Sequence, residues 1–324
     1  MDVGVIGAGR IGKLHMSILK NHNWVDTIAV YDPLLDAAWA KDSGYVSCHS
    51  LDELLSQSLD AVIIASPSDQ HLEHIEKAVK ANCAILCEKP IGLDLKLIQS
   101  TLNKVNEAGA FLQIGFNRRF DANFAAMQRS IKQSKDTPQV IKVTSRDPHC
   151  PPASYLKSSG GLFMDMAIHD FDMVCFLSNA KPIAIASMGS CTVESGLASF
   201  ADIDTAVTLI RFDTGAMAMI DNCRQALYGY DQRAEVYSNN QQWVVDNPRQ
   251  HAVESWRESG QSTAALNPFF LERYHQAYQD QIHTFLDCVK HKKNSVVTGE
   301  DGLTAVKMAF AAKQSLTTGD WVTI

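Results

Sequence analysis

Short apolar runs alternate with amphipathic stretches over the first third of the chain. The apolar runs are Asp2–Ile6, Thr27–Tyr31, Ala61–Ala65, Ala84–Cys87 and Ala110–Ile114. Between them, stretches such as Asp69–Lys80 and Asp94–Glu107 have the spacing of helices with one buried face. This alternation predicts a parallel sheet in which each helix is a crossover between strands. We therefore expect residues 1–118 to form a doubly wound Rossmann domain.

The pattern changes after Phe120, where strand-like runs begin to follow one another without helices between them. The expected strands are Gln139–Ser145, Ile183–Thr192, Thr205–Phe212, Ala216–Asn222, Gln232–Tyr237 and Trp243–Val245, and the expected helices are Ala122–Gln133, Gly161–Leu177, Phe269–Lys290 and Gly302–Leu316. A loop rich in Pro and Ser precedes the second helix, and Asp213-Thr214-Gly215 is typical of a hairpin turn. Residues 119–324 are thus expected to form an α+β domain with an open, mostly antiparallel sheet. Its C-terminal helix could pack back on the first domain.

Composition narrows the classes of protein to which the chain can belong. Its 324 residues are 46% hydrophobic and 20% charged, which is typical of a packed protein of two domains. The net charge of −7 argues against nucleic-acid and anionic-membrane partners, which need clustered Lys and Arg. No apolar run is long enough to span a membrane and no leader pattern opens the chain, so a cytoplasmic protein is expected. The eight scattered cysteines are expected to be reduced thiols, and no residue pattern indicates a metal site.

A glycine motif for binding a dinucleotide follows the first expected strand. Gly7, Gly9 and Gly12 flank Arg10 and Ile11 in the pattern GxGxxG, and a helical pattern begins inside it. The glycines permit a tight turn and close approach to a pyrophosphate, which the N-terminus of the helix then binds. A match of this kind is meaningful here because it lies between a strand and a helix.

Asp32 ends the second strand, 20 residues after Gly12, at the spacing of the acid that binds the adenosine ribose. A carboxylate there repels a 2′-phosphate, and neither Arg nor Lys follows it directly, so NAD is favoured over NADP. The other interpretation is an incidental Asp in a surface turn. Ser66, Pro67, Ser68 and His71 follow the third strand at the edge where such sheets bind ligands, so they are candidate cofactor contacts. Alternatively, Ser68 or Asp69 only caps the next helix.

Two further segments carry candidate chemistry. Glu88 and Lys89 follow the strand Ala84–Cys87, again at a carboxyl edge, although most lysines in such loops are merely exposed. Asp165 and His169 are four residues apart in an expected helix, so their side chains should share one face. A histidine can accept a hydroxyl proton near neutral pH, and a nearby carboxylate can orient it. The same pair could equally be a buried structural hydrogen bond.

Taken together, these motifs resemble the family of glucose–fructose oxidoreductase, inositol dehydrogenase and rhizopine catabolism proteins. The resemblance covers essentially the whole chain and rests on GAGRIGKLH, ASPSDQH, CEKP, GFNRRFD and SGGLFMDMAIHDFDM. It is closer to the inositol 2-dehydrogenase branch, on TSRDP, YGYDQRAEVYSNN, FFLERYHQAYQDQI and VTGEDGL. Residues 239–262 match no motif of the family.

The resemblance implies an NAD-dependent oxidation of a secondary hydroxyl on a cyclic polyol, with myo-inositol the leading substrate. It implies a catalytic triad in which His169 removes the hydroxyl proton, Lys89 stabilises the oxygen and Asp165 holds both partners and reaches a substrate hydroxyl. Glu88 and Lys89 would also contact the cofactor. The implied polyol contacts, besides the triad, are Arg119, Arg146, Asp147, Asp172, Tyr228 or Tyr230, and Tyr274. Arg119 and Asp172 could instead pair with each other, and the tyrosines could be core residues.

Other functions remain open at this point. The same triad could act on another cyclitol or sugar, such as scyllo-inositol or an aldose. Some relatives of this kind bind a dinucleotide and act as regulators without turnover, and others cleave glycosides with transient use of NAD. The presence of Lys89, Asp165 and His169 disfavours the regulator, and the SRDP and YGYD segments disfavour glycoside cleavage. By analogy with the family, a homotetramer or homodimer through the C-terminal sheet is expected, with apolar strands at Ala184–Met188 and Ala216–Ile220.

Overall fold

The first sheet of the computed structural model contains six parallel strands. The structure describes residues 1–152, 156, 159–200 and 202–324. The strands are β1 (Asp2–Ile6), β2 (Thr27–Tyr31), β3 (Val46–Ser47), β4 (Ala61–Ile64), β5 (Ala84–Cys87) and β6 (Leu112–Ile114), in the order β3-β2-β1-β4-β5-β6. Helices α1 (Arg10–Lys20), α2 (Ala37–Asp42), α3 (Leu51–Leu55), α4 (His71–Lys80) and α5 (Leu95–Glu107) connect them. The Rossmann prediction is therefore confirmed.

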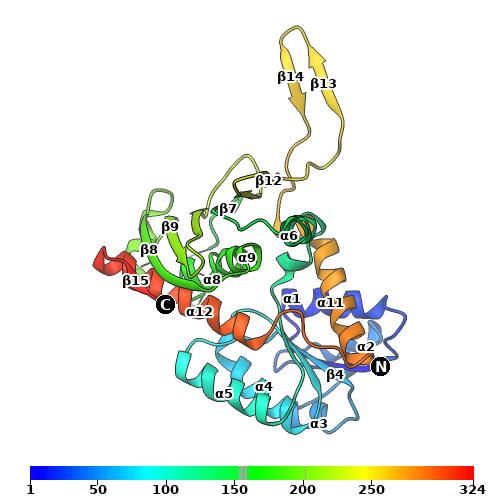
Figure 1. Cartoon of the computed structure of the whole chain (residues 1–324). Helices are drawn as coiled ribbons and strands as arrows, with labels where there is room; N and C mark the ends of the chain where they lie inside the picture. The colour runs from blue at the N-terminus through cyan, green and yellow to red at the C-terminus, as the bar shows by residue number, and fades with distance from the viewer. Residues whose placement is uncertain (153–155, 157–158, 201) are drawn as a thin grey trace. The chain divides into compact units, whose positions relative to one another are not determined.

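Burial explains why these strands read as continuous apolar runs. All four residues of β4 are buried, as are Val3 and Val5 of β1, because helices cover both faces of a parallel sheet. Figure 1 shows α4 and α5 side by side against this sheet. Strand β3 and helices α2 and α3 are short, and the hydrophobic pattern did not predict them.

A late segment of the chain completes this first unit. The described chain divides into two compact units, one made of residues 1–117 and 276–306, the other of residues 118–275 and 307–324. Helix α11 (His275–Lys290) and the start of α12 (Gly299–Thr318) thus belong with the first sheet. The backbone N–H of Ile114 in β6 donates to the carbonyl of Val297 at 2.9 Å, which ties the returning segment to the edge strand.

The second unit is built on a seven-stranded sheet. Its strands are β7 (Val140–Arg146), β8 (Pro182–Ser190), β9 (Thr205–Phe212), β10 (Met217–Cys223), β11 (Asp231–Tyr237), β12 (Gln242–Val245) and β15 (Val322–Thr323), in the order β12-β11-β7-β10-β9-β8-β15. All neighbours are antiparallel except β7 and β10, which run parallel. Gly215, with φ of +87°, closes the expected turn between β9 and β10. The prediction of an open, mostly antiparallel sheet is confirmed.

The two faces of this second sheet differ. One face packs on helices, with Ala206, Thr208 and Ile210 of β9 buried. Alternate residues, such as Val207 and Leu209, are exposed on the other face. The helices of the unit are α6 (Ala122–Ser134), α8 (Leu162–Asp165), α9 (Ile168–Ser178), α10 (Phe270–Arg273) and the end of α12, with 3₁₀ turns at Asn117–Phe120 and Ser195–Phe200. One face of the sheet is therefore covered, and the other is open.

Two helices predicted as continuous are broken. The helix expected over Gly161–Leu177 is divided into α8 and α9, because the N–H of Ala167 bonds to Leu162, five residues back, at 2.9 Å. The prediction that Asp165 and His169 share one face of a continuous helix is therefore wrong. The helix expected over Phe269–Lys290 is likewise interrupted at Tyr274, which separates α10 from α11.

Residues 239–262 contain an element that no pattern predicted. Most of a two-stranded hairpin lies here, formed by β13 (Glu254–Arg257) and β14 (Gly260–Thr263), and Figure 1 shows it as a separate arm. Trp256 at its centre is 77% exposed, which explains the lack of an inward-facing apolar pattern. Part of the Pro- and Ser-rich loop, residues 153–155 and 157–158, lies outside the described residues. No helix among the described residues is long and apolar enough to cross a membrane.

Candidate active site

The glycine loop between β1 and α1 fits a dinucleotide. A Cβ at Gly12 would lie 1.9 Å from the carbonyl oxygen of Gly7, so only glycine permits this close packing of helix on strand. Gly7 has φ of +99°, which favours glycine as well. Around Gly9, in contrast, a Cβ would meet no atom within 4 Å, so the loop has open space where a pyrophosphate would approach.

The N-terminus of α1 is available to an anion. Its N-cap, Gly9, offers no side-chain cap, and the first turn, which includes Arg10 and Ile11, contains no acidic residue. The peptide dipoles of this 11-residue helix add up, and the positive end of the helix dipole lies at the glycine loop. Asp32 lies beside it at the end of β2, where its carboxylate accepts the N–H groups of Ala8 and Leu34, both at 2.7 Å. The acid that was predicted to bind ribose therefore also holds the glycine loop.

The segment after β4, which contains the predicted cofactor contacts, also links two loops at the carboxyl edge. His71 is buried, and its ring nitrogens lie 2.7 Å from the carbonyl of Pro90 and 2.9 Å from that of Ser66, so the ring bridges the loops after β4 and β5. Burial lowers its pKa, an effect that the two carbonyl contacts oppose. Ser66 also bonds His74 through its hydroxyl, at 2.9 Å. The 3₁₀ turn at Ser68–Gln70, which follows Pro67, and helix α4 both begin without a side-chain cap, so the capping alternative is wrong.

Glu88 and Lys89 lie at the carboxyl end of β5, next to that segment. The Glu88 carboxylate is buried and lies 2.7 Å from Nε2 of His15 on α1. It also contacts Gly115, where a Cβ would approach it to 2.9 Å. Lys89 is half-buried and belongs to the first unit. Glu88 therefore joins α1 to the loop that carries Lys89.

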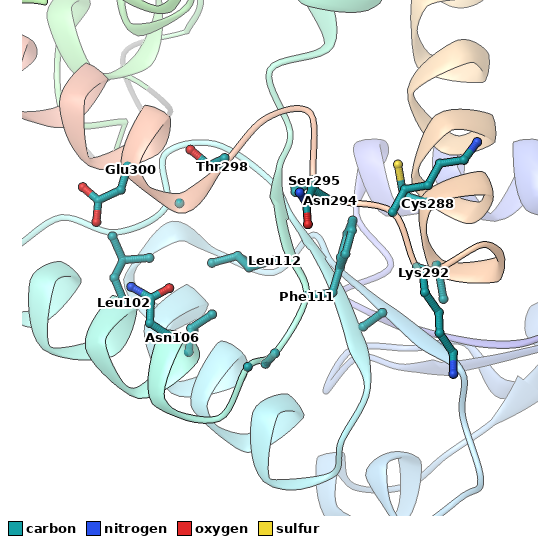
Figure 2. Close-up of a pocket in the computed structure, with 17 residues that line it drawn as sticks. Leu102, Asn106, Phe111, Leu112, Cys288, Lys292, Asn294, Ser295, Thr298 and Glu300 are labelled. Atoms are coloured by element: carbon teal, nitrogen blue, oxygen red, sulfur yellow. The ribbon is translucent and has the colours of Figure 1, made fainter.

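A separate cavity of about 830 Å³ lies at the other end of this sheet. Figure 2 shows Leu102 and Asn106 of α5 together with Thr298, which precedes α12, and Glu300 in the first turn of α12. Its lining includes Ala84, the first residue of β5, which places it at the amino edge. Because doubly wound sheets bind ligands at the carboxyl edge, we do not assign this cavity to the cofactor.

In the second unit, polar side chains gather where β7 and β10 end. These strands are parallel neighbours, so the residues that follow them, Asp147 and Arg224, lie at the same edge of the sheet. Their backbones are joined by the Asp147 N–H, which donates to the Cys223 carbonyl at 2.9 Å. The Arg224 side chain is completely buried, and its Nη1 lies 3.3 Å from Oδ2 of Asp165. Burial raises the pKa of Asp147 to about 6, against the opposing charge of Arg224.

A buried network at the same edge joins Tyr230, one of the predicted contacts, to residues that were not predicted. Arg118, rather than Arg119, donates to the Asp170 carboxylate at 2.6 Å, and Asn222 donates to the other oxygen at 2.8 Å. The guanidinium also contacts Ser145 and the hydroxyl of Tyr230, each at 3.4 Å. All five residues are buried. Burial raises the pKa of Asp170, which the charge of Arg118 opposes. Arg118, Asp170 and Arg224 were all absent from the predicted site.

Four predicted polyol contacts are engaged with other side chains. Arg119 binds Asp172 through two nitrogens, with Nε 2.9 Å from Oδ2, which is the ion pair considered as the alternative. Arg146 pairs with Asp221 and donates to the Tyr228 hydroxyl at 3.2 Å. Since side chains alternate along β7, Arg146 lies on the open face of the sheet, opposite the buried Ser145.

Tyr274 and His169 complete the predicted set in the second unit. Tyr274 is 1% exposed, packs edge-on against Tyr230, and its hydroxyl has no hydrogen-bond partner among the described residues. Burial raises its pKa, so the hydroxyl keeps its proton. His169 lies in the first turn of α9, four residues after Asp165, the last residue of α8. In the described part of the chain, no group of three or more His, Cys, Asp or Glu side chains could hold a metal ion.

Comparison with known proteins identifies the family. Residues 1–116 match the model of the NAD-binding Rossmann fold of an oxidoreductase family, and residues 136–324 match its C-terminal α/β domain. The chain is 39% identical to the uncharacterized oxidoreductase YrbE of Bacillus subtilis, covering 99% of this chain and 96% of the relative. It is 37% identical to the myo-inositol 2-dehydrogenase of Thermotoga maritima, covering 98% and 96%.

A solved structure extends this likeness to the whole fold. The scyllo-inositol dehydrogenase of Lactobacillus casei, crystallised with NAD(H) and scyllo-inositol, matches with a TM-score of 0.92 at 28% identity, over 100% of this chain and 98% of that one. The glycine loop, Asp32 and the α1 N-terminus agree with the NAD-binding fold of the family model. The chain therefore belongs to the Gfo/Idh/MocA family of oxidoreductases and carries their NAD-binding Rossmann domain.

Proposed function

We propose that this oxidoreductase oxidises one secondary hydroxyl of a cyclic polyol, with myo-inositol as substrate and the 2-keto-inositol as product. The observation that carries the proposal is the match to myo-inositol 2-dehydrogenase along nearly the full length of both chains. The polar network around Arg118 and Arg224 supports it. A polyol presents many hydroxyls, and such a ligand needs convergent donors and acceptors on an otherwise buried surface.

The residues of the first unit fit NAD. Gly9 leaves space for the pyrophosphate, the uncapped start of α1 supplies N–H donors, and Asp32 supplies a carboxylate for the ribose hydroxyls. NAD, when bound, supplies the acceptor of the hydride. The chain's contribution is to orient this acceptor, and the bridge that His71 makes between two loops helps to hold the carboxyl edge rigid.

The proposed catalytic residues transfer the proton, stabilise the reacting oxygen and orient the substrate. His169 takes the proton of the reacting hydroxyl, because a histidine is the side chain best suited to proton transfer near neutral pH. Lys89 donates to the same oxygen and stabilises its developing negative charge. Asp165 orients these partners and binds a neighbouring hydroxyl, while Arg224 holds its carboxylate at 3.3 Å.

For the remaining hydroxyls of the ring we propose Asp147 and Tyr274. The raised pKa of Asp147 lets its carboxyl group change between acceptor and donor near pH 6. Tyr274 offers a buried hydroxyl with no partner among the described residues. Arg119 with Asp172, and Arg146 with Tyr228, act instead through the side chains that they hold in place.

A second candidate is a dehydrogenase for scyllo-inositol. It is favoured by the similarity to the Lactobacillus casei enzyme, whose crystals contain that isomer. The two isomers differ in the orientation of one hydroxyl, so a single acceptor or donor in the site decides between them. A regulator that binds NAD without turnover is the remaining alternative.

The test is NADH formation by the purified full-length protein with myo-inositol, scyllo-inositol, D-chiro-inositol, glucose and galactose. We expect turnover on an inositol that falls by about a thousandfold in His169→Ala and Lys89→Met, as for loss of a proton acceptor or an oxyanion donor. His251→Ala, at an exposed histidine of the second unit, is the control and should keep full activity.

The outcomes separate the candidates. Greater kcat/KM for scyllo-inositol moves the assignment to the second candidate. Turnover of a sugar but of no inositol overturns the substrate. Measurable NAD binding with no turnover on any substrate favours the regulator.

We also propose that the chain forms a homo-oligomer through the open face of its second sheet. The exposed apolar side chains on this face support that assembly, since solvated sheets rarely carry so many. The proposed location is the cytoplasm, which the eight free cysteines support.

A further inference from the structure

We propose that Arg224 is a positioning residue of the active site, which fixes the Asp165 carboxylate by clamping both ends of the one-turn helix α8. The inference rests on the proposed function, because it takes Asp165 as a catalytic residue. It gives a role to the largest fully buried side chain among the described residues.

The first arm of the clamp is direct. Arg224 follows the last residue of β10, and its backbone N–H donates to the carbonyl of Asp204 at 2.8 Å, so its main chain is anchored to the sheet. From there Nη1 reaches Oδ2 of Asp165 at 3.3 Å. Asp165 is the last residue of α8, so this contact holds the C-terminal end of the helix.

The second arm passes through Asp202. Nη2 of Arg224 lies 3.9 Å from Oδ2 of Asp202, within ion-pair distance. The other oxygen of Asp202 accepts the N–H of Leu162, the first residue of α8, at 2.9 Å. This approach needs glycine at position 161, where φ is +84° and a Cβ would lie 2.8 Å from Oδ1 of Asp202. One guanidinium is therefore connected to both ends of α8.

Stability alone does not explain this arginine. A buried ion pair contributes little net stability, because removing both charges from water costs about as much as their attraction returns. Two of the guanidinium nitrogens of Arg224, Nε and Nη2, have no hydrogen-bond acceptor among the described residues. A buried donor without a partner is costly and calls for a specific reason. Precise orientation of a reacting carboxylate is such a reason, because small displacements of a catalytic group reduce turnover strongly.

Electrostatics point to the same role. Among the described residues, the carboxylates of Asp147, Asp165 and Asp202 interact with Arg224. The charge of Arg224 lowers the pKa of Asp147 against the larger effect of burial, whereas the charge of Asp165 raises it. Removing Arg224 would therefore leave Asp147 close to other acids without this opposing charge, and its pKa would rise further.

The experiment compares Arg224→Met and Arg224→Lys with the wild type in the full-length protein. We expect kcat to fall by about 30-fold in Arg224→Met, while the dissociation constant of NAD changes by less than about twofold, because Arg224 lies outside the Rossmann unit. Arg224→Lys keeps the charge and should recover part of the loss. The acid limb of kcat/KM should move to higher pH in Arg224→Met, a change that loss of packing alone does not produce.

Amide hydrogen exchange supplies a readout that does not need turnover. The N–H of Asp165 bonds to Gly161 at 3.0 Å and that of Met166 to Leu162 at 3.0 Å. Both should exchange about tenfold faster in Arg224→Met, since α8 loses its clamp. Arg129→Met, at an exposed arginine of α6 in the same unit, is the matched control and should change neither exchange nor kcat.

Each outcome decides the question. Wild-type kcat and exchange in a folded Arg224→Met protein overturn the clamp. If that variant does not fold, Asp202→Asn, which weakens only the second arm, and Arg224→Lys carry the test, and unchanged exchange in both overturns it. If the wild type turns over no polyol, the proposed function fails, while faster α8 exchange in the variants still supports the clamp.

Discussion

At the scale of single residues, Gly9 and Gly12 are glycines of one motif for different reasons. Gly12 permits close packing of helix on strand, and Gly9 leaves space for the cofactor. Gly12→Ala would place a Cβ against the Gly7 backbone, which cannot move aside, so we expect a loss of about 3 kcal/mol in the free energy of unfolding. Gly9 has φ of −68° and open space, so Gly9→Ala should fold normally and weaken NAD binding about tenfold or more. Urea unfolding and NAD titration of both variants check this. Equal stability losses in the two variants would contradict it.

Asp147 gives a pH-dependent prediction. Its folded pKa of about 6 lies above the unfolded value of about 3.9, so the folded state binds the proton more tightly, and this group lowers stability as pH rises from about 4 to 6. Asp147→Asn removes that cost. We expect it to be more stable than the wild type by about 1 kcal/mol at pH 8, discounted for partial exposure, and by less at pH 5.

Urea unfolding at both pH values measures the difference between Asp147→Asn and the wild type. A difference that is the same at pH 5 and pH 8 would show that ionisation of Asp147 is not its source.

A site residue could be predicted from the sequence where only one position fits the local geometry. It could not be predicted where two neighbouring residues of the same type could both fill the role. The glycine motif and Asp32 were found because a strand, a turn and a helix leave a single position for each. In Asn117–Phe120 two arginines stand side by side, and only the 3₁₀ turn decides that Arg118 bonds Asp170. The sequence around Arg224 shows only that it follows a strand. Its burial could not be predicted, because it depends on acidic residues distant in the chain.

At the scale of elements, long periodic segments were predictable and short ones were not. The bounds of β1, β2, β5 and β9 agree with their apolar runs, because strands buried on a fixed face show their period directly. The break between α8 and α9 has no such signature. Residues 161–177 keep helical periodicity, and the interruption comes from one N–H that bonds five residues back. The β13–β14 hairpin was missed for the opposite reason, because its side chains are exposed on both faces.

At the scale of the whole molecule, the open face of the second sheet carries a group of exposed apolar side chains. Met188, Val207, Leu209, Met217 and Met219 lie on it, with exposures from 37% to 70%, and register pairs Met219 with Leu209. We expect Leu209→Glu to dissociate the proposed homo-oligomer, because a charge in an apolar interface is left unpaired. Size-exclusion chromatography with light scattering measures the change in mass. Leu97→Glu, at a 60% exposed position of α5 in the first unit, is the control.

A wild-type protein that is monomeric at all concentrations would overturn the assembly. If Leu209→Glu keeps the wild-type oligomer, the interface lies on another surface.

The division of the first unit between two distant segments sets an order of events during synthesis. Residues 1–117 leave the ribosome early, but β6 acquires its bond to Val297 only after residues 118–275 have been made. At about 5–20 residues per second, the nascent Rossmann sheet waits roughly 10–30 s for its last segment. During that interval residues 118–275 of the second unit become available, whereas its last segment, residues 307–324, is made after Val297. The nucleotide-binding half of the enzyme, though encoded first, is thus completed among the last parts of the chain.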